Sequence, residues 1–302
     1  MEINASLSPP EAVSPIVPKH QVNLFFSVDL VNATNFKAKY PSKWVSVFVS
    51  FYELVSAAVK TAYHQETMVW KINGDEILFH FNIKDLGDVL KAPSELYKAM
   101  NGAQGDLFAK FSNMTKNHLY LQGALWIAAT TNVNETQKGS PRNIRGEFLE
   151  AHSGNVDFLG ADIDEGFRMA TYTSQGKIVI DPKIAYLLNE NEPDWVHLTS
   201  DAKAKEKVKI VDYKILKGIW GGHPFPIIWY APNWDIDKLF HYDERHTSEL
   251  AKAYILSKEE SHALGNIKAT FRELKFPLER IKQIEVIINN RTEENPFAKP
   301  RA

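Results

Sequence analysis

Apolar residues recur along this chain with two different spacings, one typical of strands and one typical of helices. Residues 22–30 form an almost unbroken run of apolar and β-favouring side chains with Asp29 near its end, which predicts a buried strand. Residues 43–62 carry apolar side chains every three or four positions, which predicts a helix packed on a sheet. Further strands are expected over residues 67–72, 76–81, 119–131, 156–158, 177–181, 208–216 and 225–230, and further helices over 85–100, 162–173, 182–188, 244–261 and 261–290.

Turn-forming residues mark where several of these elements begin or end. Asn73-Gly74 separates two short strands, and because both residues of a tight hairpin turn need positive φ, this dipeptide predicts a hairpin with Asp75 at its tip. Asp162 is expected to cap the helix that follows it. Pro182 is expected to begin the next helix, and Pro277 to interrupt the last one.

The order of the elements predicts an α+β fold, an antiparallel-rich sheet with flanking helices. Residues 1–19 contain several prolines and are expected to form a disordered lead-in. Residues 20–232 hold all the expected strands and are interpreted as one domain, within which the polar stretch 132–150 is expected to be a loop. Residues 233–302 are interpreted as a helical C-terminal extension.

Composition excludes several classes of protein. The 302 residues include 35 Lys and Arg against 37 Asp and Glu, and this near balance argues against a nucleic-acid partner. The chain has no cysteine, which excludes a disulfide scaffold and a thiolate zinc site and favours a reducing compartment. The N-terminus lacks the basic and apolar segments of a secretory signal, and no apolar run approaches the roughly 20 residues of a membrane helix. We therefore expect a cytoplasmic protein with no membrane partner.

Two acidic residues stand at comparable places in the expected sheet. Asp29 ends the first strand and Asp75 tips the hairpin, so neighbouring strands would bring their carboxylates within a few ångströms of each other. Carboxylates that close repel unless a cation lies between them, and Mg²⁺ and Mn²⁺ prefer such oxygen ligands. An acid in these positions is also a common turn former, so spacing alone leaves both interpretations open.

Three blocks of sequence resemble, in the same order, the signature blocks of class III adenylyl and guanylyl cyclases. They are Phe-Ser-Val-Asp-Leu at 26–30, Trp-Lys-Ile-Asn-Gly-Asp-Glu at 70–76, and Asp-Phe-Leu-Gly-Ala-Asp-Ile-Asp-Glu-Gly-Phe-Arg at 157–168. Leu-Lys-Gly-Ile at 216–219 resembles the closing hairpin of the same domain, so the likeness spans roughly residues 20–232. The resemblance implies a ferredoxin-like βαββαβ core. It also implies closure of a nucleoside triphosphate into a 3′,5′-cyclic monophosphate, with release of pyrophosphate, by two divalent metal ions, Mn²⁺ or Mg²⁺.

The resemblance assigns roles to residues at the end of the first strand. Asp29 and Asp75 would bind the two metal ions, and the Leu30 carbonyl would be a further oxygen ligand. The backbone of residues 31–35, which begins with Val31, Asn32 and Ala33, would approach the phosphates. The family's usual Gly-Phe is replaced here by Ala33-Thr34.

The resemblance also assigns roles to the helix expected over 162–173. Arg168 would reach the α-phosphate, where negative charge builds as the ribose 3′-oxygen attacks. Asp164 stands where the family usually has an asparagine that orients the ribose, and an acid there repels a triphosphate unless it is protonated or paired with Arg168. In this family the metal-binding acids come from one chain, and the base-reading residues and the arginine come from the other, which implies a homodimer with active sites at the interface.

Lys71 and Asp157 fall where adenylyl cyclases carry their base-selecting lysine and aspartate. A lysine donor and a carboxylate acceptor match the edge of adenine or cytosine, which offers a ring nitrogen beside an amino group. Uracil matches only in a shifted register, and guanine fits poorly. From the residues alone, Lys71 is equally a solvated strand lysine and Asp157 a turn acid.

Within the family, the chain is most similar to the bacterial Pycsar antiphage pyrimidine cyclases. The likeness predicts CTP as the substrate ahead of UTP, with ATP behind both, and a separate downstream effector that binds the cyclic product. The bulky residues Phe48, Phe51, Tyr52 and Trp70 would narrow the base pocket, unless they are ordinary core residues.

Alternative functions are an adenylate cyclase, an inactive cyclase-fold module that binds a nucleotide and regulates a partner, and a diguanylate-type cyclase. Gly74-Asp75-Glu76 suggests the last of these. The missing second glycine before Asp75 and the block that ends at Arg168 oppose it.

Overall fold

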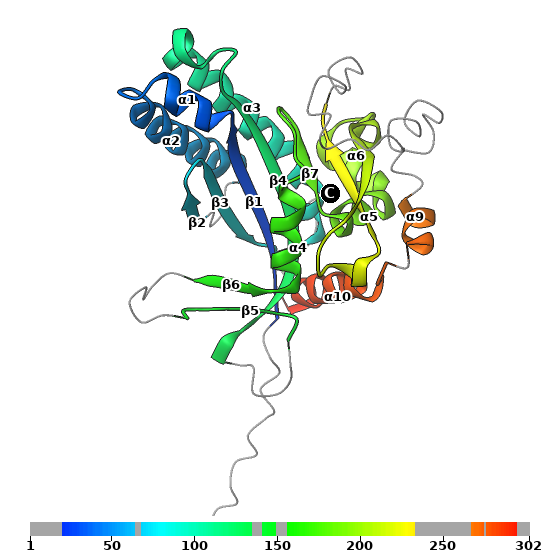
Figure 1. Ribbon diagram of the computed structural model, residues 1–302. Helices are drawn as coiled ribbons and strands as arrows, with labels where there is room; N and C mark the ends of the chain where they lie inside the picture. The colour runs from blue at the N-terminus through cyan, green and yellow to red at the C-terminus, as the bar shows by residue number, and fades with distance from the viewer. Residues whose placement is uncertain are drawn as a thin grey trace, which may run out of the picture.

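A mixed sheet with helices on both faces organises the chain, as the computed structural model shows for residues 20–63, 68–134, 141–148, 156–232, 267–274 and 276–294 (Figure 1). Seven strands lie in the order β2-β3-β1-β4-β7-β9-β8, and every pair along this path is antiparallel except β4 with β7. The predicted α+β class is therefore confirmed. The seven strands are β1 Gln21–Val31, β2 Met68–Asn73, β3 Glu76–Asn82, β4 Tyr120–Asn132, β7 Ile178–Ile180, β8 Val208–Ile215 and β9 Pro224–Tyr230.

A short two-stranded ribbon extends this sheet at one end. It consists of β5 Asn143–Gly146 and β6 Asp157–Gly160, and β5 pairs in parallel with the last residues of β4. The helices are α1 Ala33–Lys39, α2 Trp44–Tyr63, α3 Leu86–Thr115, α4 Ala161–Ala170, α5 Pro182–Glu190, α6 Glu192–Thr199, α9 Ile267–Glu273 and α10 Glu279–Glu294, with 3-10 turns η3 Ala204–Lys207 and η4 Trp220–Gly222.

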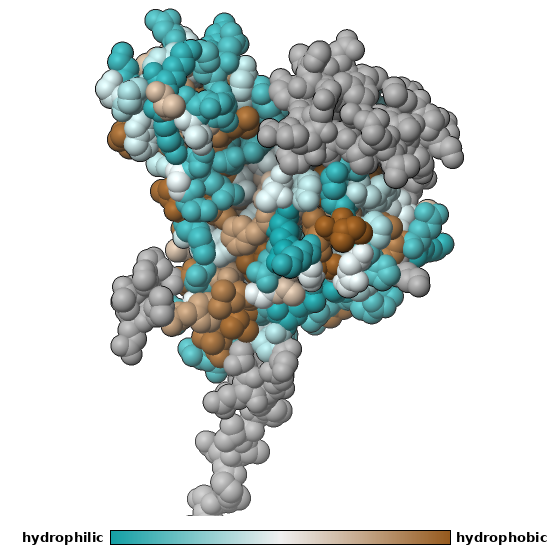
Figure 2. Space-filling view, in the orientation of Figure 1, coloured by the Kyte–Doolittle hydropathy of each residue, from teal (hydrophilic) through white to brown (hydrophobic). Residues whose placement is uncertain are grey.

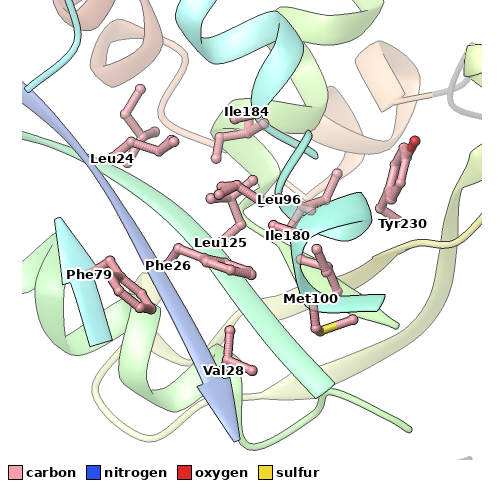
Figure 3. Close-up of a cluster of buried hydrophobic side chains, with 14 of the residues drawn as sticks. Leu24, Phe26, Val28, Phe79, Leu96, Met100, Leu125, Ile180, Ile184 and Tyr230 are labelled. Carbon is pink, nitrogen blue, oxygen red and sulfur yellow. The ribbon is translucent and has the colours of Figure 1, made fainter. Parts of the chain in front are cut away.

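Strand β1 is apolar on both faces because both faces are covered. Leu24, Phe26 and Val28 point into a large core beneath α2 and α3, together with side chains of β3, β4 and β7 (Figure 3). Successive side chains of a strand alternate between faces, and Phe25 accordingly packs in a second, smaller core beneath α4. Asp29 lies on the same face as Phe25, further along the strand.

Helix α2 is long and apolar enough to cross a membrane by length and composition alone, which the sequence prediction did not anticipate. In the structure it lies against the sheet, and the side chains that face inward are fully buried: Val47, Phe48, Phe51, Val55 and Val59. Phe48 and Phe51 therefore belong to the core beneath α2 and not to a base pocket.

Several local predictions differ from the structure. The stretch expected to be a loop contains strand β5, and helices α1 and α6 were not predicted. Helix α3 extends beyond the predicted end at Met100, since Ala103 and Leu107 continue its buried stripe past two glycines, and it kinks at Phe111 before it ends at Thr115. Asp162 does not cap α4. The cap is Gly160, at φ 143°, and the Asp162 side chain bonds to other elements.

The C-terminal helices α9 and α10 pack onto the main core. Phe271 and Ile281 are buried in the same cluster as Leu24 of β1, and α10 contacts both β1 and β4. The helix expected over 261–290 is confirmed from residue 267 onward, with its predicted break at Pro277. The helix expected over 244–261 lies outside the described residues.

The close packing of α4 against β4 leads to a prediction about the stability of the fold. A Cβ added to Gly166 would lie 2.4 Å from the Trp126 ring, whereas one added to Gly105 of α3 would have no neighbour within 4 Å. We expect Gly166→Ala to lower the free energy of unfolding by about 1–3 kcal/mol, through overpacking against a rigid ring. Gly105→Ala, the matched control, should raise it by up to about 1 kcal/mol, because alanine favours helix. Urea unfolding of both variants measures the difference, and equal effects would contradict this account of the interface.

Candidate functional site

The end of β1 and the tip of the β2–β3 hairpin are joined directly. The Leu30 amide donates a hydrogen bond to the Asp75 carbonyl at 3.1 Å, and Asp29 lies opposite Glu76 in the strand register. The predicted hairpin is present, but its two turn residues are Gly74, at φ 68°, and Asp75, one position later than predicted, because Asn73 ends β2 and pairs with Glu76. The structure therefore brings Asp29 and Asp75, 46 positions apart in the sequence, to the same corner of the sheet.

The electrostatics of this corner favour a cation. Burial raises the pKa of Asp29 above its ordinary value, and the charge of Asp75 raises it further, against a 2.9 Å hydrogen bond that Gln122 donates to Asp29 Oδ2. Burial also raises the pKa of Glu76, and both aspartates add to that shift. A divalent ion would relieve this repulsion, and two carboxylates with a backbone carbonyl are the hard oxygen donors that Mg²⁺ or Mn²⁺ accepts. No group of three or more acids, histidines or cysteines with metal-binding geometry occurs among the described residues.

The segment expected to approach phosphates turns directly into a helix. Val31 ends β1, Asn32 adopts a left-handed conformation at φ 69°, and Ala33 begins α1. The Asn32 side chain fixes this turn, because its Nδ2 donates to the His118 carbonyl at 2.9 Å and its Oδ1 accepts from Asn35 at 2.6 Å. The backbone after Leu30 is thus held in one conformation beside the two aspartates.

Lys71 and Asp157 form an ion pair at 3.0 Å, although they are 86 positions apart. Asp157 begins β6, and both side chains are a little over two-fifths exposed. The Trp70 indole Nε1 also donates to Asp157, at 2.8 Å. Burial raises the pKa of Asp157, but the Phe158 amide, Lys71 and Trp70 together outweigh it, and the pKa lies below its ordinary value. The sequence analysis selected Lys71 and Asp157 as candidate base-binding residues, but it did not predict the hydrogen bond from Trp70.

Arg168 and Asp164 lie on the exposed side of α4. They share a face as predicted, but within the described part of the chain neither forms an ion pair with the other. Gly166 lies against Trp126, and Thr173 donates to the Gly123 carbonyl, so Arg168 is level with the middle of β4. Asp29 lies opposite Gln122 of β4 in the strand register. This position is about 10 Å along the strands from the part of β4 that lies below Arg168. In addition, α4 packs on the face of the sheet and is not part of it. Arg168 and Asp29 of one chain are therefore not adjacent.

A buried network of charges holds the other side of α4. Lys183 of α5 is 1% exposed, and its Nζ lies 2.9 Å from Asp181, 3.1 Å from Glu165 and 3.4 Å from Asp162. Arg142 and Arg280 approach the same carboxylates, at 3.0 Å from Asp162 and 3.4 Å from Glu165.

The cations of this network control the ionisation of Asp162. Burial raises the pKa of Asp162, but Lys183 and Arg142 reverse that effect and lower the pKa to about 2. The sequence prediction missed the network. Its only local signal is a lysine within the apolar pattern of the helix that begins at Pro182.

Comparison with known proteins identifies the fold. No protein-family model and no curated protein matches this sequence. Among solved structures, the adenylyl cyclase CyaB from P. aeruginosa superposes with a TM-score of 0.52 at 13% identity, covering 73% of this chain and 98% of that chain. The guanylyl cyclase Cya2 gives a TM-score of 0.48, also at 13% identity, over 72% of this chain and 97% of that one. The superposition on CyaB shows that the chain has the fold of class III cyclase domains.

Proposed function

We propose that this protein is a nucleotide cyclase that converts a nucleoside triphosphate to the 3′,5′-cyclic monophosphate and pyrophosphate. The observation that carries the proposal is the convergence of Asp29 and Asp75 at one corner of a cyclase fold, where the Leu30 amide bonds to the Asp75 carbonyl at 3.1 Å. Burial and, to a smaller degree, the charge of Asp75 raise the pKa of Asp29, and a bound divalent cation would counter both effects.

The proposed reaction assigns each residue a task. Asp29, Asp75 and the Leu30 carbonyl would hold two Mn²⁺ or Mg²⁺ ions, which when bound polarise the phosphate and stabilise the entering and leaving oxygens. The ribose 3′-hydroxyl loses its proton to solvent water and its oxygen bonds to the α-phosphorus, while the bond from that phosphorus to the pyrophosphate oxygen breaks and pyrophosphate leaves. Arg168 would stabilise the charge that develops on the α-phosphate. Asp164 would lie beside the ribose, where a carboxylate can accept a hydrogen bond from a hydroxyl.

The separation of Arg168 from Asp29 within one chain supports a homodimer in which each site takes its acids from one protomer and its arginine from the other. Exposed apolar side chains add to this support. The edge strand β2 exposes Met68, Val69 and Ile72, and β6 exposes Leu159. Figure 2 shows that apolar surface on this side of the molecule gathers in patches, one of them near the β5–β6 ribbon.

Mixing two inactive variants tests the shared site. An Asp29→Ala chain mixed with an Arg168→Ala chain under conditions that exchange protomers should recover about a quarter of wild-type activity, since half of the dimers are mixed and each mixed dimer has one intact site. Asp29→Ala mixed with Asp75→Ala is the control and should recover none, because each site then lacks an acid. No recovery in the first mixture would contradict the shared site.

The resemblance of the sequence to pyrimidine cyclases leads us to propose a pyrimidine substrate, CTP first and UTP next, with ATP behind both. The Lys71 and Asp157 pair fits cytosine and adenine alike. Lys71 and Asp157 lie side by side as a donor and an acceptor, and Trp70 packs against them. A cyclic pyrimidine nucleotide made here would act as a second messenger in antiphage defence, recognised by a separate effector protein.

One incubation tests both the activity and the substrate. The purified protein is supplied with each of the four ribonucleoside triphosphates and Mn²⁺, and the products are identified by mass spectrometry. Cyclic CMP as the main product supports the proposal, and ATP as the sole cyclised substrate overturns the pyrimidine assignment. If no triphosphate is cyclised but one binds in equilibrium dialysis, the protein is instead a nucleotide-binding regulatory module.

A further inference from the structure

The two carboxylate oxygens of Asp157 have different surroundings. Oδ1 accepts all three protein hydrogen bonds: from Trp70 Nε1 at 2.8 Å, from the Phe158 amide at 2.9 Å, and from Lys71 Nζ at 3.0 Å. Within the described residues, no donor bonds to Oδ2. The Asp157 side chain is 44% exposed, so a ligand can approach this residue from the solvent.

Trp70 is the part of this arrangement that cannot move easily. Its ring lies 5.4 Å from Phe25, 5.3 Å from Phe158 and 5.7 Å from Phe167, so three elements of the fold hold it in place. The Lys71 ammonium lies 4.2 Å from the centre of the same ring, within the range of a cation–π interaction.

A strand irregularity makes the arrangement possible. Neighbouring residues of a regular strand point to opposite faces, yet Trp70 and Lys71 both reach Asp157. The register of β2 against β3 shifts between Val69 and Lys71, which is the bulge that turns both side chains toward β6.

We propose that Trp70 determines which base this site accepts, by holding Asp157 Oδ1 and leaving Oδ2 as a fixed hydrogen-bond acceptor beside the Lys71 donor. This inference rests on the proposed function and deepens it. A fixed carboxylate oxygen accepts the amino group at C4 of cytosine, and Lys71 donates to the adjacent ring nitrogen. The oxo group at C4 of uracil would place two acceptors against each other. A polar group of the site that is left without its partner is what lets such sites discriminate strongly between ligands.

The test compares CTP with UTP in two matched tryptophan variants. Trp70→Phe keeps the aromatic ring and removes the indole N–H, so Asp157 gains freedom to rotate. We expect the ratio of kcat/KM for CTP over UTP to fall at least about tenfold, with kcat for CTP changed less than about threefold. Trp229→Phe is the control. It also removes an indole hydrogen bond of 2.8 Å, to the Tyr172 carbonyl, but on another strand, and should leave the ratio unchanged.

Binding measurements separate failure of this inference from failure of the proposed function. Calorimetric titration of CTP and of UTP with Ca²⁺ in place of Mn²⁺ reports base selection even if the protein cyclises neither. An unchanged preference in Trp70→Phe, or a wild-type protein that does not distinguish the two bases, would overturn the role of Trp70.

A second variant covers the case in which Trp70→Phe does not fold. Asp157→Asn replaces one acceptor by an amide donor and should shift the preference toward UTP, whose C4 oxygen the amide can contact. If Asp157→Asn keeps the CTP preference, the base is not recognised at this pair and the proposal fails.

Discussion

Replacing Asp75 by Asn is expected to lower the rate of cyclisation by about 10²–10³-fold, the usual loss when one preorganised electrostatic group is removed from an active site. The backbone contact of residue 75 to Leu30 does not depend on its side chain, so the hairpin remains in place. The metal-free variant should be slightly more stable than the wild type, because the charge of Asp75 raises the pKa of Asp29 and its removal relieves that repulsion. Loss of activity with a gain in stability distinguishes a functional acid from a structural one.

Two measurements check this result. Mn²⁺ should raise the unfolding temperature of the wild type but not of Asp75→Asn, a readout that requires no turnover. Asp106→Asn, at an exposed position of α3, is the control and should change neither the activity nor the response to Mn²⁺. Activity above a tenth of wild type in Asp75→Asn would show that its carboxylate does not take part.

Replacing Lys183 by Ala is expected to lower the free energy of unfolding by about 3–5 kcal/mol, the typical cost of removing one partner from a buried charge network. The Lys183 side chain is 1% exposed and lies between three carboxylates. The side chains of two of these residues, Glu165 and Asp181, are 2% exposed. Burial lowers the pKa of Lys183, but Asp162, Asp181 and Glu165 raise it more, so the ammonium is held in its charged form. Without it, Asp181 and Glu165 would face each other across a space that excludes water.

A surface ion pair provides the control for Lys183. Lys205 and Glu192 are 2.7 Å apart, but their side chains are 34% and 39% exposed. Lys205→Ala should therefore change the free energy of unfolding by less than about 1 kcal/mol. Urea unfolding monitored by tryptophan fluorescence measures both variants, and similar losses in the two would show that the buried network is not specially stabilising.

Local signals made much of the fold predictable. The apolar run before Asp29, the Asn73-Gly74 dipeptide and Pro182 each act within a few residues. The strand, the hairpin and the helix that they predict are present, although the hairpin turn lies one residue later, at Gly74-Asp75. The prediction for Asp162 failed because its partners come from distant parts of the chain. Asn143 and Lys183 draw the carboxylate away from the amides it would otherwise cap.

The candidate site was likewise predictable where local signals determine the structure, and not where contacts between distant parts of the chain do. Asp29 and Asp75 follow from a strand end and a hairpin tip, which the sequence reveals directly. The hydrogen bond from Trp70 to Asp157 depends on a bulge that shifts the register of β2 by one position. A strand of six residues is too short for its hydrophobic pattern to predict such a shift. Strand β5 was missed because four residues that include Asn, Arg and Gly carry too little β propensity to stand out from a loop.

The packing of α9 and α10 bears on how the protein can be shortened. A recombinant fragment that stopped at residue 232 would match the expected domain boundary, yet it would leave the apolar surface beneath Phe271 and Ile281 open to water. It would also remove Arg280 from beside Glu165, on the helix that carries Arg168. Such a fragment should aggregate on expression, and inactivity in it would say nothing about the chemistry of the whole chain.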